Sequence, residues 1–388
     1  MTLRWRMLAC LVIGRMAMAF QFQAVAALAP LYLQTLDIGL ATLGLLVGLY
    51  MAPGILISLP GGALARRYGD REMVIAGLAL MVIGGTIMAL FNSLEAQLAG
   101  RLIAGCGGVA LNVLASKMVA DWFADGPVAT AMGILITAWP VGLALALGLL
   151  PLAAGAGGLT AALGVVIGVA ALGLAVMVLG YRDPPRSVQD GGATAAPAGL
   201  LPGRAALGPM LAAGSLWGLY NAGLGMVFAF GPAMLATRGL TLEAAGALVA
   251  VAFWGVAVAV PLGGALADAS RRGTGLMVAG IVGFAALVAM VPVLEPTILL
   301  FAILGLLGGL PAGPITSLPA RSLAPRDRAQ GIAVFFTLFY LAVVLAPPLI
   351  GHLADAAGDP ALPFIAAAVL EATALLALLA YRLRTRRP

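Results

Sequence analysis

Three charged residues lie inside long apolar stretches of the sequence, where their side chains would meet lipid or a protein interior: Arg15, Arg101 and Glu371. An ionised side chain at the centre of a bilayer costs several kcal/mol and usually serves a function. Arg15 has no carboxylate within one helical turn, so we predict that it binds a negatively charged ligand. The alternative is that its guanidinium extends toward the aqueous interface or pairs with a backbone carbonyl.

Polar and aromatic residues on neighbouring helix faces could complete a binding site around Arg15. Gln23 follows Arg15 on one helical face, and Asn112 follows Arg101 on another. A shift of 202 residues aligns the second half of the chain with the first and places Trp217 opposite Arg15. The predicted ligand-binding residues are therefore Arg15, Gln23, Asn112, Trp217, Tyr220 and Asn221.

The sequence contains none of the residue patterns that mark common enzymes. It has no metal-ligand spacing, no paired carboxylates on a polar domain and no G-x-x-x-x-G-K-[ST] phosphate loop. Both cysteines, Cys10 and Cys106, lie in apolar stretches, where they are expected to be buried small side chains. We therefore expect no enzyme activity, no cofactor, no metal site and no direct use of ATP.

The elements that would position these residues are membrane-spanning helices. Hydrophobic residues make up 62% of the 388 and charged residues only 9%, against about 25% in soluble proteins. In lipid, only helices and closed barrels satisfy the backbone, and apolar runs of about 20 residues indicate helices. Twelve are predicted, over residues 7–33, 39–65, 72–92, 95–119, 128–153, 158–181, 207–236, 241–267, 274–294, 297–320, 329–353 and 361–381.

Basic residues set the expected orientation of these helices. With twelve helices, the two termini share one side, and every Lys and Arg except Arg15, Arg101 and Arg238 falls on that side. The excess of positive charge on cytoplasmic connections places both termini in the cytoplasm. The scattered charges form no nucleic-acid surface, and a bacterial inner membrane is the expected location.

An internal repeat divides the chain into two halves. The sequence GGALA occurs at 61–65 and again 202 residues later at 263–267. Residues 182–206 are rich in Pro, Gly and charge, which predicts a linker. We therefore predict a six-helix bundle at 1–181, a cytoplasmic linker at 182–206 and a second six-helix bundle at 207–388, with a substrate bound between the pseudo-symmetric bundles.

Two motifs resemble signatures of the major facilitator superfamily. GALARRYGDR at 62–71 resembles G-x-L-A-D-R-x-G-R-R, although Arg66 and Asp70 depart from its charges, and GALADASRRG at 264–273 repeats it. Arg101 begins RLIAGCGG, which resembles R-x-x-x-G-x-G-G. The resemblance implies an all-α fold of two six-helix bundles and a gating role for Gly62, Arg66, Arg67, Gly69, Arg71, Arg101, Gly264, Asp268 and Arg271.

The resemblance also implies alternating access of a central path to the two sides of the membrane. The first, second, fourth and fifth predicted helices, with residues 112–117 followed by 120–123, look most like the cyanate and nitrate/nitrite branch. Asp268 is expected to accept hydrogen bonds near the start of helix five, whereas Arg66, its counterpart in the repeat, cannot do so. The gate at the cytoplasmic side should therefore be asymmetric.

The function expected from these features is secondary transport of a small inorganic or organic anion, by symport or exchange. No carboxylate is predicted at mid-depth beside the path, because Glu371 falls in helix twelve, which the resemblance makes an outer support. Any coupled protons would use the charge of the substrate, an arginine-linked switch or Glu371. The alternatives are a proton-coupled efflux pump for lipophilic compounds and a receptor or scaffold that transports nothing.

Overall fold

The structure, a computed structural model, describes residues 3–57, 69–123, 127–184, 202–270, 272–323 and 328–385. The first half contains α1 (Leu3–Ala27), α2 (Ala29–Thr35), α3 (Leu40–Leu49), α4 (Pro53–Ile57), α6 (Asp70–Leu90), α7 (Leu94–Trp122) and α8 (Val128–Gly180). The second half contains α9 (Arg204–Thr237), α10 (Leu242–Ser270), α11 (Gly273–Met290), α12 (Ile298–Gly309), α13 (Ala312–Thr316), α14 (Leu318–Ser322), α15 (Arg328–Ala357) and α16 (Leu362–Thr385). The predicted linker 182–206 lies mostly outside the described residues.

These helices provide the predicted membrane spans. Ten described helices are long and apolar enough to cross a bilayer, and the shorter α3 is also apolar. The long α8 contains two of the predicted spans, because Gly157 and Gly158 leave helical geometry at the predicted connection. Gly158 has φ +66°, which glycine adopts without strain. The described parts of the twelve predicted spans are thus mainly helical, and residues 58–65 of the second predicted span lie outside the described residues.

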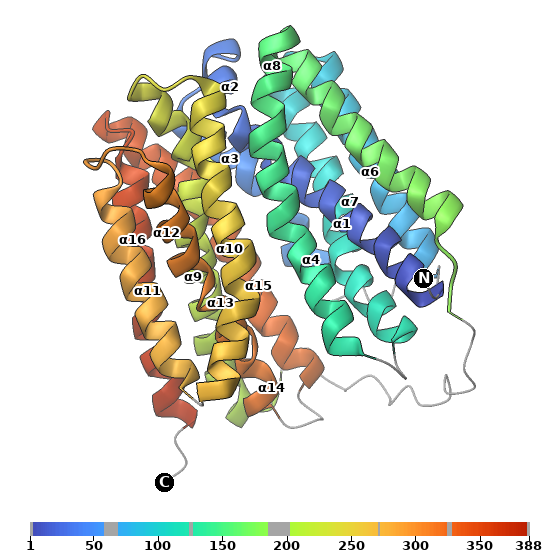
Figure 1. Cartoon of the computed structure of the whole chain (residues 1–388), viewed down its shortest axis with the longest axis vertical. Coiled ribbons are helices and arrows are strands. Elements are labelled where there is room, and N and C mark those ends of the chain that lie inside the picture. Colours follow the sequence, from blue (N-terminus) through green and yellow to red (C-terminus); the bar gives the residue numbers. More distant parts are fainter. Residues whose placement is uncertain are drawn as a thin grey trace.

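The spans form two bundles that stand side by side (Figure 1). In the first, α1 packs on α8, and α6 packs on α7; in the second, α9 packs on α15 and α16, and α10 packs on α12. Figure 1 places α2 at one end of the molecule and the last turns of α16 at the other. We call the first of these the α2 end, which also holds the start of α3 and the end of α15.

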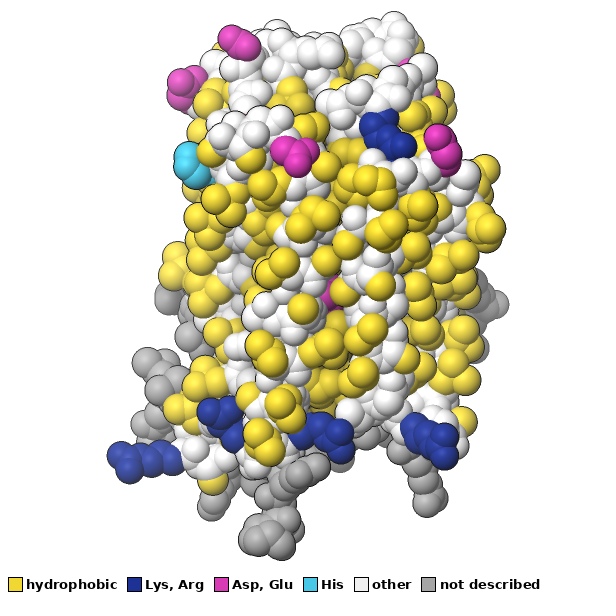
Figure 2. Space-filling model, turned by 90° about the vertical axis from the view of Figure 1, so that its left-hand side faces the viewer, with side chains coloured by type: hydrophobic (Ala, Val, Ile, Leu, Met, Phe, Trp, Pro, Cys, Tyr) yellow, Lys and Arg dark blue, Asp and Glu magenta, His cyan; other side chains and the backbone are white. Residues whose placement is uncertain are grey.

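The surface matches a protein that spans a membrane. On the face shown in Figure 2, apolar side chains cover the middle of the molecule, and Lys and Arg side chains gather toward one end. Asp and Glu side chains on that face lie mainly toward the opposite, α2 end. This separation agrees with the distribution of charge in the sequence.

Two seams join the bundles, one between α3 and α15 and the other between α8 and α10. A Cβ atom on Gly44 would lie 2.5 Å from the Pro347 carbonyl carbon of α15. A Cβ atom on Gly246 would lie 2.5 Å from the Leu147 carbonyl oxygen of α8. Gly44 and Gly246 are equivalent under the 202-residue shift, so the repeat places a glycine in each seam, where the two backbones approach closely.

Proline residues interrupt three helices that were predicted to be continuous. A break at Leu28 precedes Pro30, α3 ends at Leu49 before Pro53, and α12 ends at Gly309 before Pro311. Proline lacks a backbone N–H group and collides with the preceding turn, so a helix often breaks near it. In the predicted span 297–320, the chain continues as the short helices α13 and α14.

Candidate functional site

Arg15 lies in the middle of α1, half-buried, as the sequence predicts for a charge inside the membrane. Its Nε atom is buried and has no hydrogen-bond partner among the described residues. Tyr340 of α15 lies close enough to interact with it electrostatically. No carboxylate in the described part of the chain forms an ion pair with Arg15, so its positive charge is not neutralised there.

Asn112 of α7 and Tyr340 of α15 lie beside each other near this charge. The Asn112 side chain is within hydrogen-bonding reach of the Tyr340 hydroxyl, and its buried Oδ1 atom has no partner in the described residues. Three helices, α1, α7 and α15, therefore bring a guanidinium, an amide and a phenol to one region between the bundles. The guanidinium can donate to an anionic group of a ligand, and the free Oδ1 atom of Asn112 can accept a hydrogen bond from a donor group.

An aromatic wall, formed by Trp217, Tyr220, Phe335 and Phe339, continues from this polar group. The Trp217 ring of α9 stacks on the rings of Tyr220, Phe335 and Phe339, with centroids 5.5, 6.2 and 6.0 Å away. Phe339 in turn lies 5.0 Å from Tyr340. The buried Trp217 Nε1 atom has no acceptor among the described residues. The wall can hold a flat or apolar body, and the indole can donate a hydrogen bond.

Three other predicted binding residues use their polar groups within the protein. Gln23 Nε2 donates to the Phe228 carbonyl oxygen over 2.9 Å and so joins α1 to α9 across the two bundles. The Tyr220 hydroxyl donates to the Gly308 carbonyl oxygen of α12. Asn221 Nδ2 donates to the Trp217 carbonyl oxygen one turn earlier, over 2.8 Å. Of the six predicted binding residues, Arg15, Asn112 and Trp217 therefore keep a polar atom without a partner among the described residues. The other three form hydrogen bonds that hold the helices in place or stay within one helix.

Arg101 of α7 is buried, with 1% of its surface exposed, and is saturated with backbone contacts. Its guanidinium donates to the carbonyl oxygens of Gln21, Phe22 and Leu46 at 2.8–3.0 Å and to that of Val47 at 3.3 Å. These bonds tie α7 to α1 and α3 inside the first bundle. Arg101 therefore holds α1, the helix that carries Arg15, against α7 and α3.

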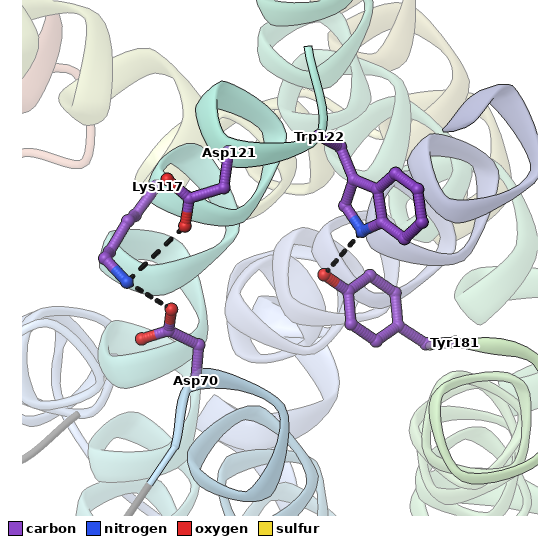
Figure 3. A network of polar contacts seen from close by, with 5 residues as sticks. All are labelled: Asp70, Lys117, Asp121, Trp122 and Tyr181. Carbon is purple, nitrogen blue, oxygen red and sulfur yellow. Dashed lines mark hydrogen bonds and ion pairs between the residues drawn. The ribbon is translucent and has the colours of Figure 1, made fainter. Parts of the chain in front are cut away.

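Asp70, one of the two altered charges of the first motif, has a partner in α7 (Figure 3). Lys117 lies between Asp70 and Asp121, forming an ion pair with each, 3.5 Å long to Asp121. The negative charge of Asp70, which departs from the motif, is thus neutralised by Lys117 of α7. Nearby, Arg71 donates to the Val178 carbonyl oxygen over 2.9 Å. Gly69 has φ +90°, so a residue without a side chain fits the turn before α6.

A second contact in Figure 3 joins α7 to the end of α8. The Trp122 indole donates to the Tyr181 hydroxyl over 3.1 Å. Burial raises the pKa of Tyr181, which therefore remains a neutral hydroxyl that can accept this bond. These contacts fasten the ends of α6, α7 and α8 to one another.

Several predicted gating residues cannot be placed. Gly62, Arg66, Arg67 and Arg271 lie outside the described residues, and so does the side chain of Asp268. The predicted contact between Asp268 and helix five therefore stays a prediction. Gly264 is described, and its Cα lies 3.0 Å from where a Cβ on Gly313 would stand, so α10 and α13 approach closely there.

The α2 end contains a contact between the bundles that the sequence did not predict. Asp355, near the end of α15, accepts hydrogen bonds from the backbone N–H groups of Leu40 and Ala41, each over 2.8 Å. A carboxylate at the N-terminus of α3 satisfies free N–H groups and interacts favourably with the helix dipole. The partners are 315 and 314 residues apart, and no sequence motif indicates the pairing.

The sequence and the fold both have counterparts among known proteins. The family model described as "Major Facilitator Superfamily" matches residues 11–237 and 218–388. An "Uncharacterized transporter" of Buchnera aphidicola is 37% identical over 67 residues, which are 17% of each chain. "Inner membrane transport protein YajR" of Escherichia coli is 27% identical over 138 residues, 36% of this chain and 30% of YajR. The matched stretches thus span less than a third of either relative.

Solved transporter structures share the fold over nearly the whole chain. A mutant form of the nucleoside transporter NupG superposes with a TM-score of 0.76 at 12% identity, and the match covers 99% of this chain and 100% of NupG. A bacterial homologue of the human lysosomal transporter Spinster, described as inward-facing and unoccupied, has a TM-score of 0.75 at 18% identity. This match covers 99% of this chain and 97% of the homologue.

None of these four proteins is described as a cyanate or nitrate transporter, so that branch stays a prediction. The motifs, the duplicated six-helix bundle and the family match over both halves agree. The chain belongs to the major facilitator superfamily, and it is an integral membrane transporter rather than an enzyme.

Proposed function

We propose that this transporter moves a small organic anion by secondary active transport across the bacterial inner membrane. The observation that carries the proposal is the unpaired Nε atom of Arg15, half-buried between the bundles without an acidic partner in the described residues. A guanidinium presents a planar pair of donors that matches a carboxylate. An anion in the path would neutralise this charge.

The aromatic wall supports an organic substrate over an inorganic one. The ring centroids of Trp217 and Phe339 lie 6.0 Å apart. The Phe339 ring also contacts Tyr340, which lies close to Arg15. A carboxylate with an apolar or aromatic body would place its charge at Arg15 and its body along the wall, whereas nitrate would leave the wall without a contact. The predicted cyanate or nitrate substrate is therefore the weaker version of this proposal.

Substrate would enter this arrangement from the side of the termini. The Gln23 bond to Phe228, the Asp355 bonds to α3 and the close approach at Gly44 all join the bundles toward the α2 end. The distribution of basic residues in the sequence predicts that the termini are cytoplasmic. We therefore assign the structure to a state that is closed toward the outside. Exchange of this state with an outward-open one would carry the substrate across.

Export of a lipophilic compound is the second candidate function, because the same aromatic wall could hold an uncharged ligand. The two functions differ in what they require of Arg15. Anion transport needs its charge, whereas lipophilic export needs only the wall.

The test uses the full chain in proteoliposomes with an imposed pH gradient. Radiolabelled benzoate, hexanoate and nitrate serve as probes, and a fluorescent lipophilic cation tests export. We expect benzoate to be transported best. Arg15→Ala should lower its affinity about ten- to a hundredfold, since a hydrogen bond to a charged group contributes about 1.5–3 kcal/mol, and Arg15→Lys should restore only part of it.

Arg204→Ala is the control, because it removes an exposed positive charge at the start of α9, more than three helical turns before Trp217. It should transport benzoate as the wild type does. Wild-type benzoate affinity in Arg15→Ala would refute the proposed role of Arg15. Transport of the cation without any transport of the three anions would favour lipophilic export.

A further inference from the structure

Glu371 is a buried acidic residue that the proposed function does not use. It lies in the middle of α16 with 0% of its surface exposed, and both carboxyl oxygens are buried without a hydrogen-bond partner among the described residues. An outer helix of a transporter bundle needs no acid for packing. A buried carboxyl without partners is costly unless it has a role.

The carboxyl group lies against a glycine of α9. A Cβ atom on Gly223 would stand 2.7 Å from Glu371 Oε1, 3.0 Å from its Cγ and 3.2 Å from the Ala367 carbonyl oxygen. The absence of a side chain at Gly223 therefore makes the room that the carboxyl occupies. Oε1 and the Ala367 carbonyl oxygen, one turn earlier on α16, border the same small space.

No positive charge faces this carboxyl from the helices that pack on α16, which are α9, α11 and α15. Their described residues place one titratable group within electrostatic reach, the hydroxyl of Tyr220 on α9. Nor do the described residues contain a group of three His, Cys, Asp or Glu side chains that could hold a metal ion. Hard cations require several oxygen ligands, and one carboxyl does not provide them.

A proton is the ligand that this environment accepts. A carboxylate would be buried here as a charge without a donor, whereas a neutral carboxyl group brings no charge into this space and costs far less to bury. We propose that Glu371 is a proton-binding site of the second bundle and that its carboxyl group is protonated in this state. This inference concerns a different site from Arg15 and does not depend on the identity of the substrate.

Tyr220 provides a connection from this site to the path. Its hydroxyl donates to the Gly308 carbonyl of α12, and its ring stacks on Trp217 at 5.5 Å. Once Glu371 loses its proton, the carboxylate needs a donor, and the Tyr220 hydroxyl is the one that the structure places near it. Recruiting that hydroxyl would break its bond to Gly308 and move the ring that supports Trp217. Release of the proton would thereby reshape the aromatic wall.

The first experiment is infrared spectroscopy of the purified full chain in nanodiscs at pH 7. A protonated carboxyl gives a C=O band that is separate from carboxylate bands and shifts in D2O. Exposed acids are ionised at this pH, and Asp70 is paired with Lys117. We expect the band in the wild type, its complete loss in Glu371→Gln and a shifted band in Glu371→Asp. A wild-type spectrum without the band, or a band that survives in Glu371→Gln, would overturn the proposal.

The second experiment follows tryptophan fluorescence while the pH is raised, with Trp217→Phe to assign the signal. The Trp217 emission should change over the pH range in which the infrared band disappears, and Glu371→Gln should abolish that change. The wild-type measurement remains decisive if a variant fails to fold. An emission that stays constant while the band disappears would refute the connection through Tyr220. Neither experiment needs a transported substrate, so a negative result for Arg15 would leave this test intact.

Discussion

Removal of the Asp355 carboxylate should open the α2 end of the molecule. In Asp355→Ala, the N–H groups of Leu40 and Ala41 lose two charge-assisted hydrogen bonds of 2.8 Å each. One such bond contributes about 1.5–3 kcal/mol when shielded from water, and solvent screens these exposed bonds, so we assign that range to the pair. The ratio of closed to open molecules should fall about ten- to a hundredfold. Asp355→Asn keeps one acceptor and should fall in between.

Electron spin resonance measures this change as a distance between two spin labels. Cysteines introduced at the exposed residues Gln34 in α2 and Glu295 before α12 carry the labels, one on each bundle. The native Cys10 and Cys106 are replaced by serine. We expect a longer distance to gain population in Asp355→Ala in nanodiscs, and more so than in Asp355→Asn.

The matched control is Asp359→Ala, four residues along the chain. Asp359 also accepts a 2.8 Å hydrogen bond from a backbone N–H group, that of Ala361, but both residues belong to the second bundle. Its loss should leave the distance between the labels unchanged. An identical distance distribution in Asp355→Ala and the wild type would refute the proposal that this carboxylate holds the bundles together.

Two further substitutions test the seam and the support of the path. Gly44→Val should widen the same label distance, because its side chain would meet the Pro347 backbone, whereas Gly225→Ala has open space around its Cβ and should not; equal distances in both would contradict the close approach. Arg101→Met should lower the unfolding temperature in detergent strongly, since the carbonyl oxygens of Gln21 and Leu46 lose a buried donor at about 1–3 kcal/mol each. An unchanged unfolding temperature would show that these bonds contribute little.

The apolar runs and the internal repeat of the sequence predicted the fold, but they did not predict where prolines end the helices. The bilayer requires an apolar run in each span, and the 202-residue repeat relates the two halves of the chain, so the predicted spans and the break near Gly158 followed from these two patterns. The breaks before Pro53 and Pro311 were missed, because an apolar run does not reveal how the chain accommodates a proline. Whether proline kinks or ends a helix depends on the neighbouring helices.

The sequence indicated which residues could belong to the candidate site, but it did not indicate which groups their side chains contact. The charge of Arg15 stood out because it lies in an apolar stretch. Arg101 has the same kind of sequence environment, yet its guanidinium is used by four carbonyl oxygens. Only the packing of α7 on α1 and α3 distinguishes the two. The contact of Asp355 with α3 is equally invisible in sequence, because it joins residues more than three hundred positions apart.

The tight turn within α8 couples the surrounding lipid to the equilibrium between the states of the transport cycle. Only Gly157 and Gly158 leave helical geometry between the two spans of α8. The ends of the two spans that meet at this turn must therefore move together. The first span forms the seam with α10, and the second exposes Leu172 and Leu179 at 58% and 85% of their surface. When the seam opens, the first span would tilt this lipid-facing span with it. Hydrophobic mismatch between the second span and the bilayer would then favour one state, which makes membrane thickness an input to transport.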